Sequence, residues 1–226
     1  MKNFIKYVFI SILLIVLTVV AFFTYQGCSI YKEVINKAPI KDKIDEIKSS
    51  KNYISYQEIP KDFKNAIIAI EDHRFKSHSG IDIVGTTRAI ITNLYSRSLL
   101  QGGSTITQQL AKNMYFTQEA KPDRKIAELF VALDLEKKYS KEDILTFYIN
   151  IIYFGDGYYG LKEASLGYFN KEPLDLTLDE ITLLAGIPNA PSIYALSNRP
   201  DLARERQKYV ISAMKEYGYL SADFQM

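Results

Sequence analysis

The chain has 226 residues, of which 47% are hydrophobic and 24% charged, and its formal net charge at pH 7 is +2. This length allows one sizeable domain with an appendage, and the small net charge gives no electrostatic footprint for nucleic acid. Cys28 is the single cysteine, which excludes an intramolecular disulfide and a cysteine-rich metal site.

An apolar stretch near the N-terminus predicts a membrane anchor. Residues 7–25 carry no charged side chain, and roughly 20 apolar residues are enough to span a bilayer as a helix. Lys2 and Lys6 precede the stretch, so the positive-inside rule places the N-terminus in the cytoplasm and the rest of the chain outside. We therefore predict residues 1–28 as a cytoplasmic tip and a transmembrane signal-anchor.

Two alternatives for this stretch rank lower. A cleaved signal peptide comes second, because the apolar run is longer than a usual signal-peptide core and no Ala-x-Ala site follows it. A lipidated Cys28 comes last, because Tyr25-Gln26-Gly27 is a poor match to a lipoprotein signal.

The rest of the chain is predicted as a mainly α-helical domain behind a short stalk. Residues 29–50 carry alternating charges and indicate a juxtamembrane stalk with some helical content. Residues 53–56 are β-prone and give the one predicted strand, and residues 51–226 form the predicted domain. Capping patterns and apolar spacing predict helices that start near Pro60, Ile83 (ending near Tyr95), Ser104, Pro122, Ser140, Thr177 and Pro200. The predicted core faces include Ile126, Leu129, Phe130 and Leu133 in the helix after Pro122, and Leu202, Tyr209, Val210, Ala213, Met214 and Tyr217 in the last helix.

The stretch from Glu71 to Gly80 carries the first candidate catalytic group. Phe63, Ala66, Ile67 and Ile70 have the spacing of a buried helical face, so Glu71 is predicted at the end of a packed helix. A carboxylate held by a rigid element beside a cleft suits a general acid or base. The alternative is a solvated helix end with a chance Glu-Asp pair, which an isolated Glu would favour.

The stretch 102–113 is a candidate anion or sugar site. Two glycines precede a predicted helix N-terminus, where backbone N–H groups and the helix dipole favour an anion. Ser104, Gln108 and Lys112 are four residues apart and offer a hydroxyl, an amide and an ammonium on one face. A plain Gly-Gly turn with a helix cap is the alternative, and it explains the glutamines and the lysine less well.

A second carboxylate lies in the stretch that begins at Arg124. Arg124 and Glu128 are at i and i+4 and meet on one side of the predicted helix. As a surface ion pair they would contribute little to stability. If this face instead lines the cleft that holds Glu71, two carboxylates lie among several cations, which suits glycosyl chemistry with a pyrophosphate leaving group. His73 and His78 have no other ligands near them in sequence, so no metal site is expected.

The chain contains, in this order, EDHRFKSHSG, GGSTITQQLAKN, RKIAELFVALDLE, ILTFYINIIYFGDGYYGLKEAS and LTLDEITLLAGIPNAPS. Together these stretches resemble the five motifs of the family 51 glycosyltransferases, the peptidoglycan glycosyltransferases of bacterial cell-wall synthesis. The resemblance covers about residues 50–215. It implies a lysozyme-like, mostly helical fold and a monofunctional enzyme related to the glycosyltransferase domain of class A penicillin-binding proteins.

The resemblance also implies roles for individual residues. Glu71 looks like the general base that takes the proton of the acceptor 4-hydroxyl, and Glu128 resembles a second glutamate that assists the leaving lipid pyrophosphate or holds the donor. Lys121 is suggested as a substitute for a basic residue in the loop before the third motif. The positions that match sugar- and pyrophosphate-binding residues are Arg74, Phe75, Arg88, Ser104, Gln108, Gln109, Lys112 and Arg124.

The implied substrates are lipid II and the growing glycan chain, at the outer face of a bacterial cytoplasmic membrane. Membrane lipid and other cell-wall synthesis proteins are the expected partners. Residues 81–100 match a mobile, partly membrane-associated region. No cofactor is required, and stimulation by a divalent cation, Mg²⁺ or Mn²⁺, is left open.

Other readings keep the same residues but change the reaction. A lytic transglycosylase or lysozyme would need one acid and would act on finished wall. A catalytically silent cell-wall scaffold would not need both Glu71 and Glu128. A sugar-nucleotide transferase ranks lower, because the chain has no Asp-x-Asp to hold a metal-bound diphosphate.

Overall fold

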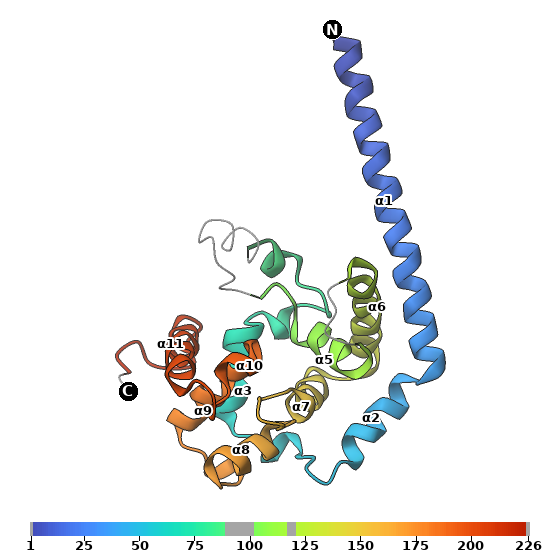
Figure 1. Cartoon of the computed structure of the whole chain (residues 1–226). Helices are drawn as coiled ribbons and strands as arrows, with labels where there is room; N and C mark the ends of the chain where they lie inside the picture. Colours follow the sequence, from blue (N-terminus) through green and yellow to red (C-terminus); the bar gives the residue numbers. More distant parts are fainter. Residues whose placement is uncertain (1, 89–101, 117–120, 225–226) are drawn as a thin grey trace.

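The computed structural model describes residues 2–88, 102–116 and 121–224, and most of these residues are helical (Figure 1). Within these ranges the β pairing is limited to one isolated bridge between Tyr153 and Tyr159. The helical class predicted from the sequence is therefore confirmed.

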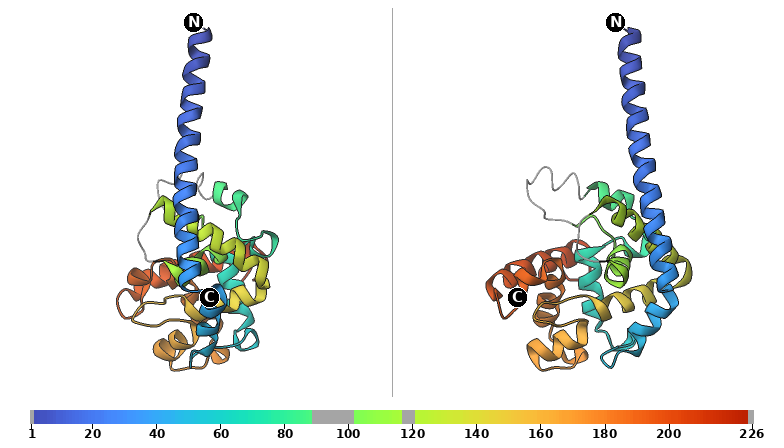
Figure 2. Two further views of the ribbon diagram at one scale, coloured as in Figure 1. Left: turned by 90° about the vertical axis from the view of Figure 1, so that its right-hand side faces the viewer. Right: turned by 45° about the vertical axis from the view of Figure 1, so that its right-hand side comes forward.

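Helix α1 (Lys2–Lys37) projects far out of the domain, as Figures 1 and 2 show. Residues Phe4–Lys37 have a mean hydropathy of 2.7 in their most apolar window, which has none of its surface buried. The helix is thus long and apolar enough to cross a membrane.

The last turns of α1 pack along helix α6 (Pro122–Lys138), and this is the most extensive helix pair in the fold. Gly27 allows the close approach, because a Cβ there would lie 2.6 Å from the Cβ of Ile126. Four residues further on, the Tyr31 ring lies 5.5 Å from that of Phe130, and its hydroxyl donates a hydrogen bond to Asp134. The anchor helix is therefore connected to the domain in two ways, by the continuous polypeptide and by side-chain packing on α6.

The segment predicted as a stalk packs against the domain. It consists of the end of α1 and helix α2 (Ile40–Ser49). Ile40 and Ile44 are 2% and 1% exposed, and α2 contacts helix α7 (Lys141–Ile151). Ile40 and Ile44, spaced by one helical turn, thus join the core, and Ile35 and Ile47 of the same segment pack against it.

The core forms around α3 (Lys61–Glu71), α5 (Ile106–Tyr115), α7, α9 (Leu178–Gly186) and α11 (Pro200–Glu216). Helix α3 packs on α9 and α11, and α5 packs on α6 and α7. The ends of α3 and α5 therefore meet in the middle of the domain. The remaining elements are α8 (Leu161–Phe169), α10 (Pro191–Tyr194), the helical residues 83–88, and the 3₁₀ turns η1 (Tyr56–Glu58), η2 (Phe75–Ser77), η3 (Pro173–Asp175) and η4 (Ile187–Asn189).

The predicted helix starts are confirmed where a local cap defines them. Thr105, Ser140 and Thr177 each accept from the backbone of the residue three positions on and form complete capping boxes. The helix predicted from Ile83 begins there, but its course after residue 88 lies outside the described residues. Helix α8 was not predicted, because its glycine- and tyrosine-rich approach resembles a loop.

Three predictions are wrong. Residues 53–56 form no strand, because the backbone N–H and C=O of Ile54 bond to the side chain of Asn150. The core face of α6 is Ala127, Val131, Ala132 and Leu135, whereas the predicted stripe is only partly buried. Tyr209 is 54% exposed and does not belong to the core face of α11.

Candidate active site

Glu71 is the last residue of α3, and one of its oxygens is fixed by a chain of hydrogen bonds. The Tyr148 hydroxyl donates to Gln109 Oε1 at 3.1 Å, and Gln109 Nε2 donates to Glu71 Oε2 at 2.8 Å. The other oxygen, Oε1, is shielded from solvent and has no hydrogen-bond partner among the described residues. The structure therefore holds one carboxylate oxygen through Gln109, and the lone pairs of the second are not used by the described residues.

The environment of Glu71 changes its acidity. Burial raises the pKa of this carboxyl above its ordinary value, while the hydrogen bond from Gln109 and the charge of Arg206 act in the opposite direction. Burial disfavours the charged form because the protein interior solvates it poorly. A raised pKa makes the carboxylate a stronger base, provided that it stays ionised at the working pH.

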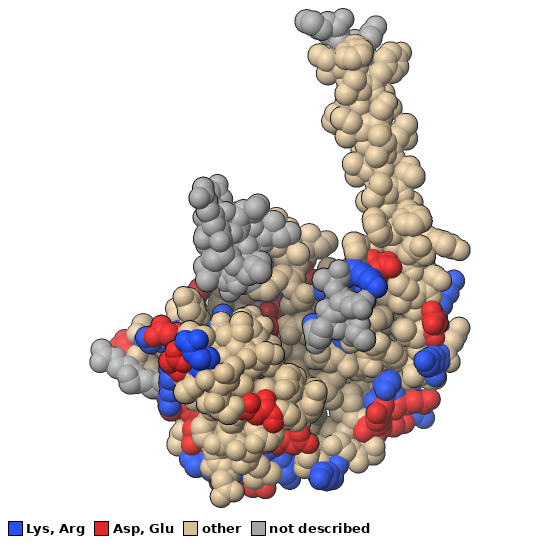
Figure 3. All heavy atoms as spheres, viewed as in Figure 1, with Lys and Arg blue, Asp and Glu red and all other residues tan. Residues whose placement is uncertain are grey.

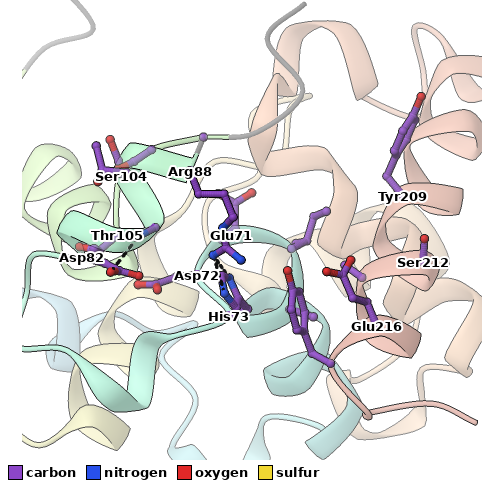
Figure 4. Close-up of a pocket in the computed structure, with 18 of the residues that line it drawn as sticks. Glu71, Asp72, His73, Asp82, Arg88, Ser104, Thr105, Tyr209, Ser212 and Glu216 are labelled. Carbon is purple, nitrogen blue, oxygen red and sulfur yellow. Dashed lines mark hydrogen bonds between the residues drawn. The ribbon is translucent and has the colours of Figure 1, made fainter. Parts of the chain in front are cut away.

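Glu71 lines a cavity of about 250 Å³, which we call the Glu71 pocket. Figure 4 shows Arg88 and His73 beside Glu71, with Ser104, Thr105 and Asp82 on one side and three residues of α11 on the other. The end of α3, residues 82–88, the loop before α5 and α11 thus form its walls. The lining side chains with polar groups are Glu71, Asp72, His73, Asp82, Thr86, Arg88, Ser104, Thr105, Arg206, Tyr209, Ser212, Glu216 and Tyr217.

A second cavity of about 870 Å³, the Lys112 groove, lies on the other side of Gln109. Burial and the nearby cations Arg124 and Lys125 lower the pKa of Lys112. Glu71 lines the first cavity and Gln109 lines the second, so their hydrogen bond connects the walls of the two cavities. The groove is lined by Gln109, Lys112, Asn113, Tyr148, Tyr153 and Tyr159 and by residues of α2, α8 and α10.

Glu128 is 1% exposed and lies among cations. Arg124 Nη1 is 2.6 Å and Lys125 Nζ is 3.0 Å from its two oxygens. Lys125 also donates to Ser104 Oγ at 2.8 Å, which connects this cluster to the Glu71 pocket. The pair of Arg124 and Glu128 is therefore buried and is not a surface ion pair. Ile126 and Phe130 occupy the side of α6 that faces α1, so Glu128 lies on the side that faces the domain.

Asp72 fixes the end of α3 to the start of α5. His78 Nε2 lies 2.9 Å and 3.0 Å from the two oxygens of Asp72, and the backbone N–H of Ile106 donates to Asp72 at 3.0 Å. Both side chains are nearly buried. These contacts hold the backbone next to Glu71. Within the described residues, no three His, Cys, Asp or Glu side chains converge on a metal site.

Two of the predicted binding residues have other roles in this structure. Phe75 is 1% exposed and packs in the core, with Lys141 over its ring at 4.4 Å. Gln108 is 3% exposed, and its side chain accepts from the backbone of Thr105 as part of the α5 cap. Both side chains have structural contacts here, and their predicted binding roles stay predictions.

The other predicted binding residues are distributed around the two cavities. Arg88 and Ser104 line the Glu71 pocket, where Arg88 donates to His73 Nε2 at 2.6 Å. Arg74 pairs with Asp82 at 3.2 Å. Lys121 is exposed at the first turn of α6 and lines neither cavity.

Arg206 and Tyr148 are the site residues that the motif analysis missed. Arg206 lies four residues before Val210, on the apolar stripe of α11, and Tyr148 lies on the core face of α7. A charged or hydroxylated residue within an apolar stripe was the signal that could have found them.

The comparisons agree with this geometry. The family model described as "Transglycosylase" matches residues 39–215 and so begins just before α2. Penicillin-binding protein 1F of Bacillus subtilis is 46% identical over 169 residues, which are 75% of this chain and 24% of that protein. Penicillin-binding protein 1A of Streptococcus pneumoniae is 38% identical over 241 residues, covering 97% of this chain and 33% of the relative.

A shorter relative matches over most of its length. This candidate transglycosylase of Cupriavidus necator is 40% identical over 183 residues, which cover 81% of this chain and 79% of that protein. In contrast, the chain spans only about a quarter to a third of the two penicillin-binding relatives.

Proposed function

The chain belongs to the transglycosylase family, and from this premise we propose that it polymerises lipid II into the β-1,4-linked glycan strands of peptidoglycan, releasing undecaprenyl pyrophosphate. The observation that carries the proposal is the Glu71 carboxylate, which lines one cavity and is held through one oxygen by Gln109, a residue that lines a second cavity. A transfer between two glycan substrates needs two binding regions with one base between them.

In the proposed reaction, Glu71 is the general base. Its free oxygen takes the proton of the 4-hydroxyl of the acceptor N-acetylglucosamine. The hydroxyl oxygen then forms a bond to the anomeric carbon of the donor chain, and the bond from that carbon to the lipid pyrophosphate breaks with inversion. A positioned base of this kind contributes about 10²–10⁴-fold to a rate.

The cations beside the Lys112 groove support a pyrophosphate leaving group. Lys112 lies near Arg124, Lys125 and Glu128, since the charges of all three act on its ammonium. Charge-assisted hydrogen bonds from such groups stabilise the negative charge that develops on a departing pyrophosphate. In this proposal Glu128 keeps Arg124 and Lys125 in place, and simple hydrolysis of finished glycan would not use these cations.

Helix α1 supports a single-pass anchor with the domain on the outer face of the cytoplasmic membrane. The acceptor and the donor both carry lipid tails that stay in the bilayer, so the site has to work close to its surface. The contacts of Gly27 and Tyr31 with α6 fix the domain beside the point where α1 would leave the membrane. Other cell-wall synthesis proteins are expected partners.

The first test is polymerisation of labelled lipid II by the detergent-solubilised protein, with lysozyme digestion of the product. We expect glycan chains from the natural sequence and a loss of about 10²–10⁴-fold in Glu71→Gln. Glu205→Gln, an exposed glutamate on α11 paired with Lys208, is the matched control and should remain active.

Thermal melts show whether each variant is folded, and parallel assays with Mg²⁺ or Mn²⁺ test the optional stimulation. Normal synthesis by folded Glu71→Gln would refute the role of the base. Release of fragments from purified sacculi, without any use of lipid II, would replace polymerisation with the lytic reaction.

A further inference from the structure

Arg206 is a nearly buried cation for which the described part of the chain offers no ion pair. It is 8% exposed and lines the Glu71 pocket. Within the described residues its guanidinium forms no ion pair, and its Nε is buried without a hydrogen bond. An unpaired charge in a protein interior costs several kcal/mol. A cation is kept in such a place where it meets a negative charge that matters for function.

The packing of α11 on α9 brings Arg206 to the pocket. A Cβ on Gly186, the last residue of α9, would lie 3.0 Å from Arg206 Cγ. Any larger residue at this position would have to displace the aliphatic stem of the arginine. Gly186 therefore lets α11 lie close enough to α9 for Arg206 to reach the wall of the pocket.

The buried carboxylates beside Glu71 already have partners. Asp72 is paired with His78, and Asp82 with Arg74. From residues 82–88, Arg88 donates to His73. The remaining titratable groups that face the pocket or its hydrogen-bond chain are Tyr148 from α7 and Tyr209, Glu216 and Tyr217 from α11.

Among the described residues, Glu71, whose Oε1 is buried, and the nearly buried Arg206 thus line this pocket without an ion pair, whereas Glu216 and Arg88 are exposed. The charge of Arg206 lowers the pKa of Glu71 while burial raises it. The two effects serve different needs of a general base. Burial makes the carboxylate a stronger base, and the cation keeps it deprotonated.

We propose that Arg206 is a positioning residue for Glu71, and that its unpaired guanidinium keeps the Glu71 carboxylate ionised and ready to accept the acceptor proton. The proposal rests on the role of Glu71 in the proposed function. It also explains how the base is reset, because a nearby cation favours release of the proton after each transfer.

The direct test is a titration of Glu71 in the full-length protein labelled with ¹³C at glutamate Cδ. The Glu71 signal is identified by its absence in Glu71→Gln. In Arg206→Met the titration midpoint should rise by about 1 pH unit or more, the usual size of an effect from one nearby opposite charge. Arg206→Lys should restore most of the natural midpoint, and Arg204→Met, on the exposed side of α11, should leave it unchanged.

The same variants give a readout in turnover. Activity requires ionised Glu71, so it rises with pH through the Glu71 midpoint, and this limb should move to higher pH in Arg206→Met. Lipid II turnover at a pH just above the natural midpoint should fall in Arg206→Met and then recover as the pH is raised. A merely structural arginine would lower activity equally at every pH.

Stability separates the remaining outcomes. Arg206→Met removes the cost of burying the guanidinium but also its attraction for Glu71, so the melting temperature should change little. A folded Arg206→Met protein with an unchanged Glu71 midpoint would overturn the proposal, and so would a large loss of stability without that shift. A shifted midpoint in a protein that does not polymerise lipid II would support the pairing and refute the proposed function.

Discussion

Gln108 and Gln109 show how neighbouring residues of one type take different roles. Successive positions on a helix point about 100° apart. Gln108 therefore turns back toward Thr105 and caps α5, while Gln109 crosses to Glu71 and Tyr148. The first side chain stabilises the helix that frames the pocket, and the second holds the Glu71 carboxylate.

This division predicts two distinct phenotypes. Gln108→Ala should lower the free energy of unfolding by about 1 kcal/mol, the usual effect of losing a helix cap, and should keep most of the turnover number. Gln109→Ala should lower lipid II turnover by about 10-fold or more, since misplaced groups cost rate steeply, and should change stability less. Denaturant melts and turnover assays of both variants check this, and equal effects on both quantities would contradict the assignment.

Helix α6 shows which parts of the fold could be predicted from the sequence. The starts of α5, α7 and α9 were predictable because each cap depends on residues three positions apart. The core face of α6 was not, because this helix packs on α1 with Ile126 and Phe130 and on the core with small residues. A search for a single apolar stripe in the sequence selects the stripe with the bulkier residues, which in this structure faces α1.

Because α6 packs on both α1 and the core, the burial of Glu128 could not be predicted from the sequence. Its pairing with Arg124 followed from the spacing, but whether the pair faced solvent or the cavities depended on where α1 lies. The motifs therefore predicted which carboxylates to consider, and the tertiary structure showed that Glu128 is buried. The Arg206 contribution and the roles of Phe75 and Gln108 required tertiary contacts.

The contact between α1 and α6 can be tested at Gly27. Gly27→Leu would force a side chain into the 2.6 Å gap beside Ile126, and overpacking of this kind costs about 1–3 kcal/mol. The melting temperature should fall by about 2–4 °C for each kcal/mol. Lipid II turnover should fall with it, because α6 carries Glu128.

The matched control is Ser29→Leu, on the exposed side of the same helix. It adds the same side chain without meeting α6 and should leave both quantities nearly unchanged. If the two variants melt at the same temperature, the anchor does not stabilise the domain in the way that the packing indicates.

At the scale of the molecule, the anchor and an exposed apolar surface lie at the same end. Residues 83–88 lie on the end of the domain toward which α1 projects, and α8 lies at the opposite end (Figures 1 and 2). Ile83 and Val84 are 74% and 57% exposed. Figure 3 shows charged side chains gathered over the domain and almost none on the visible face of the projecting part of α1. This arrangement suits a domain that rests against the membrane beside its own anchor.

Depth in the bilayer can be compared at two exposed apolar positions. In a Cys28→Ser background, a fluorophore on Val84→Cys should be quenched by nitroxide-labelled lipids when the full chain is reconstituted in vesicles. The same label on Leu174→Cys should not be quenched, because Leu174 is 61% exposed but lies next to α8 at the far end. Equal quenching at both positions would refute the orientation. Selective quenching at Val84 would place residues 82–88 at the membrane surface. Because these residues also form a wall of the Glu71 pocket, a lipid-linked acceptor could then enter the pocket without leaving the bilayer.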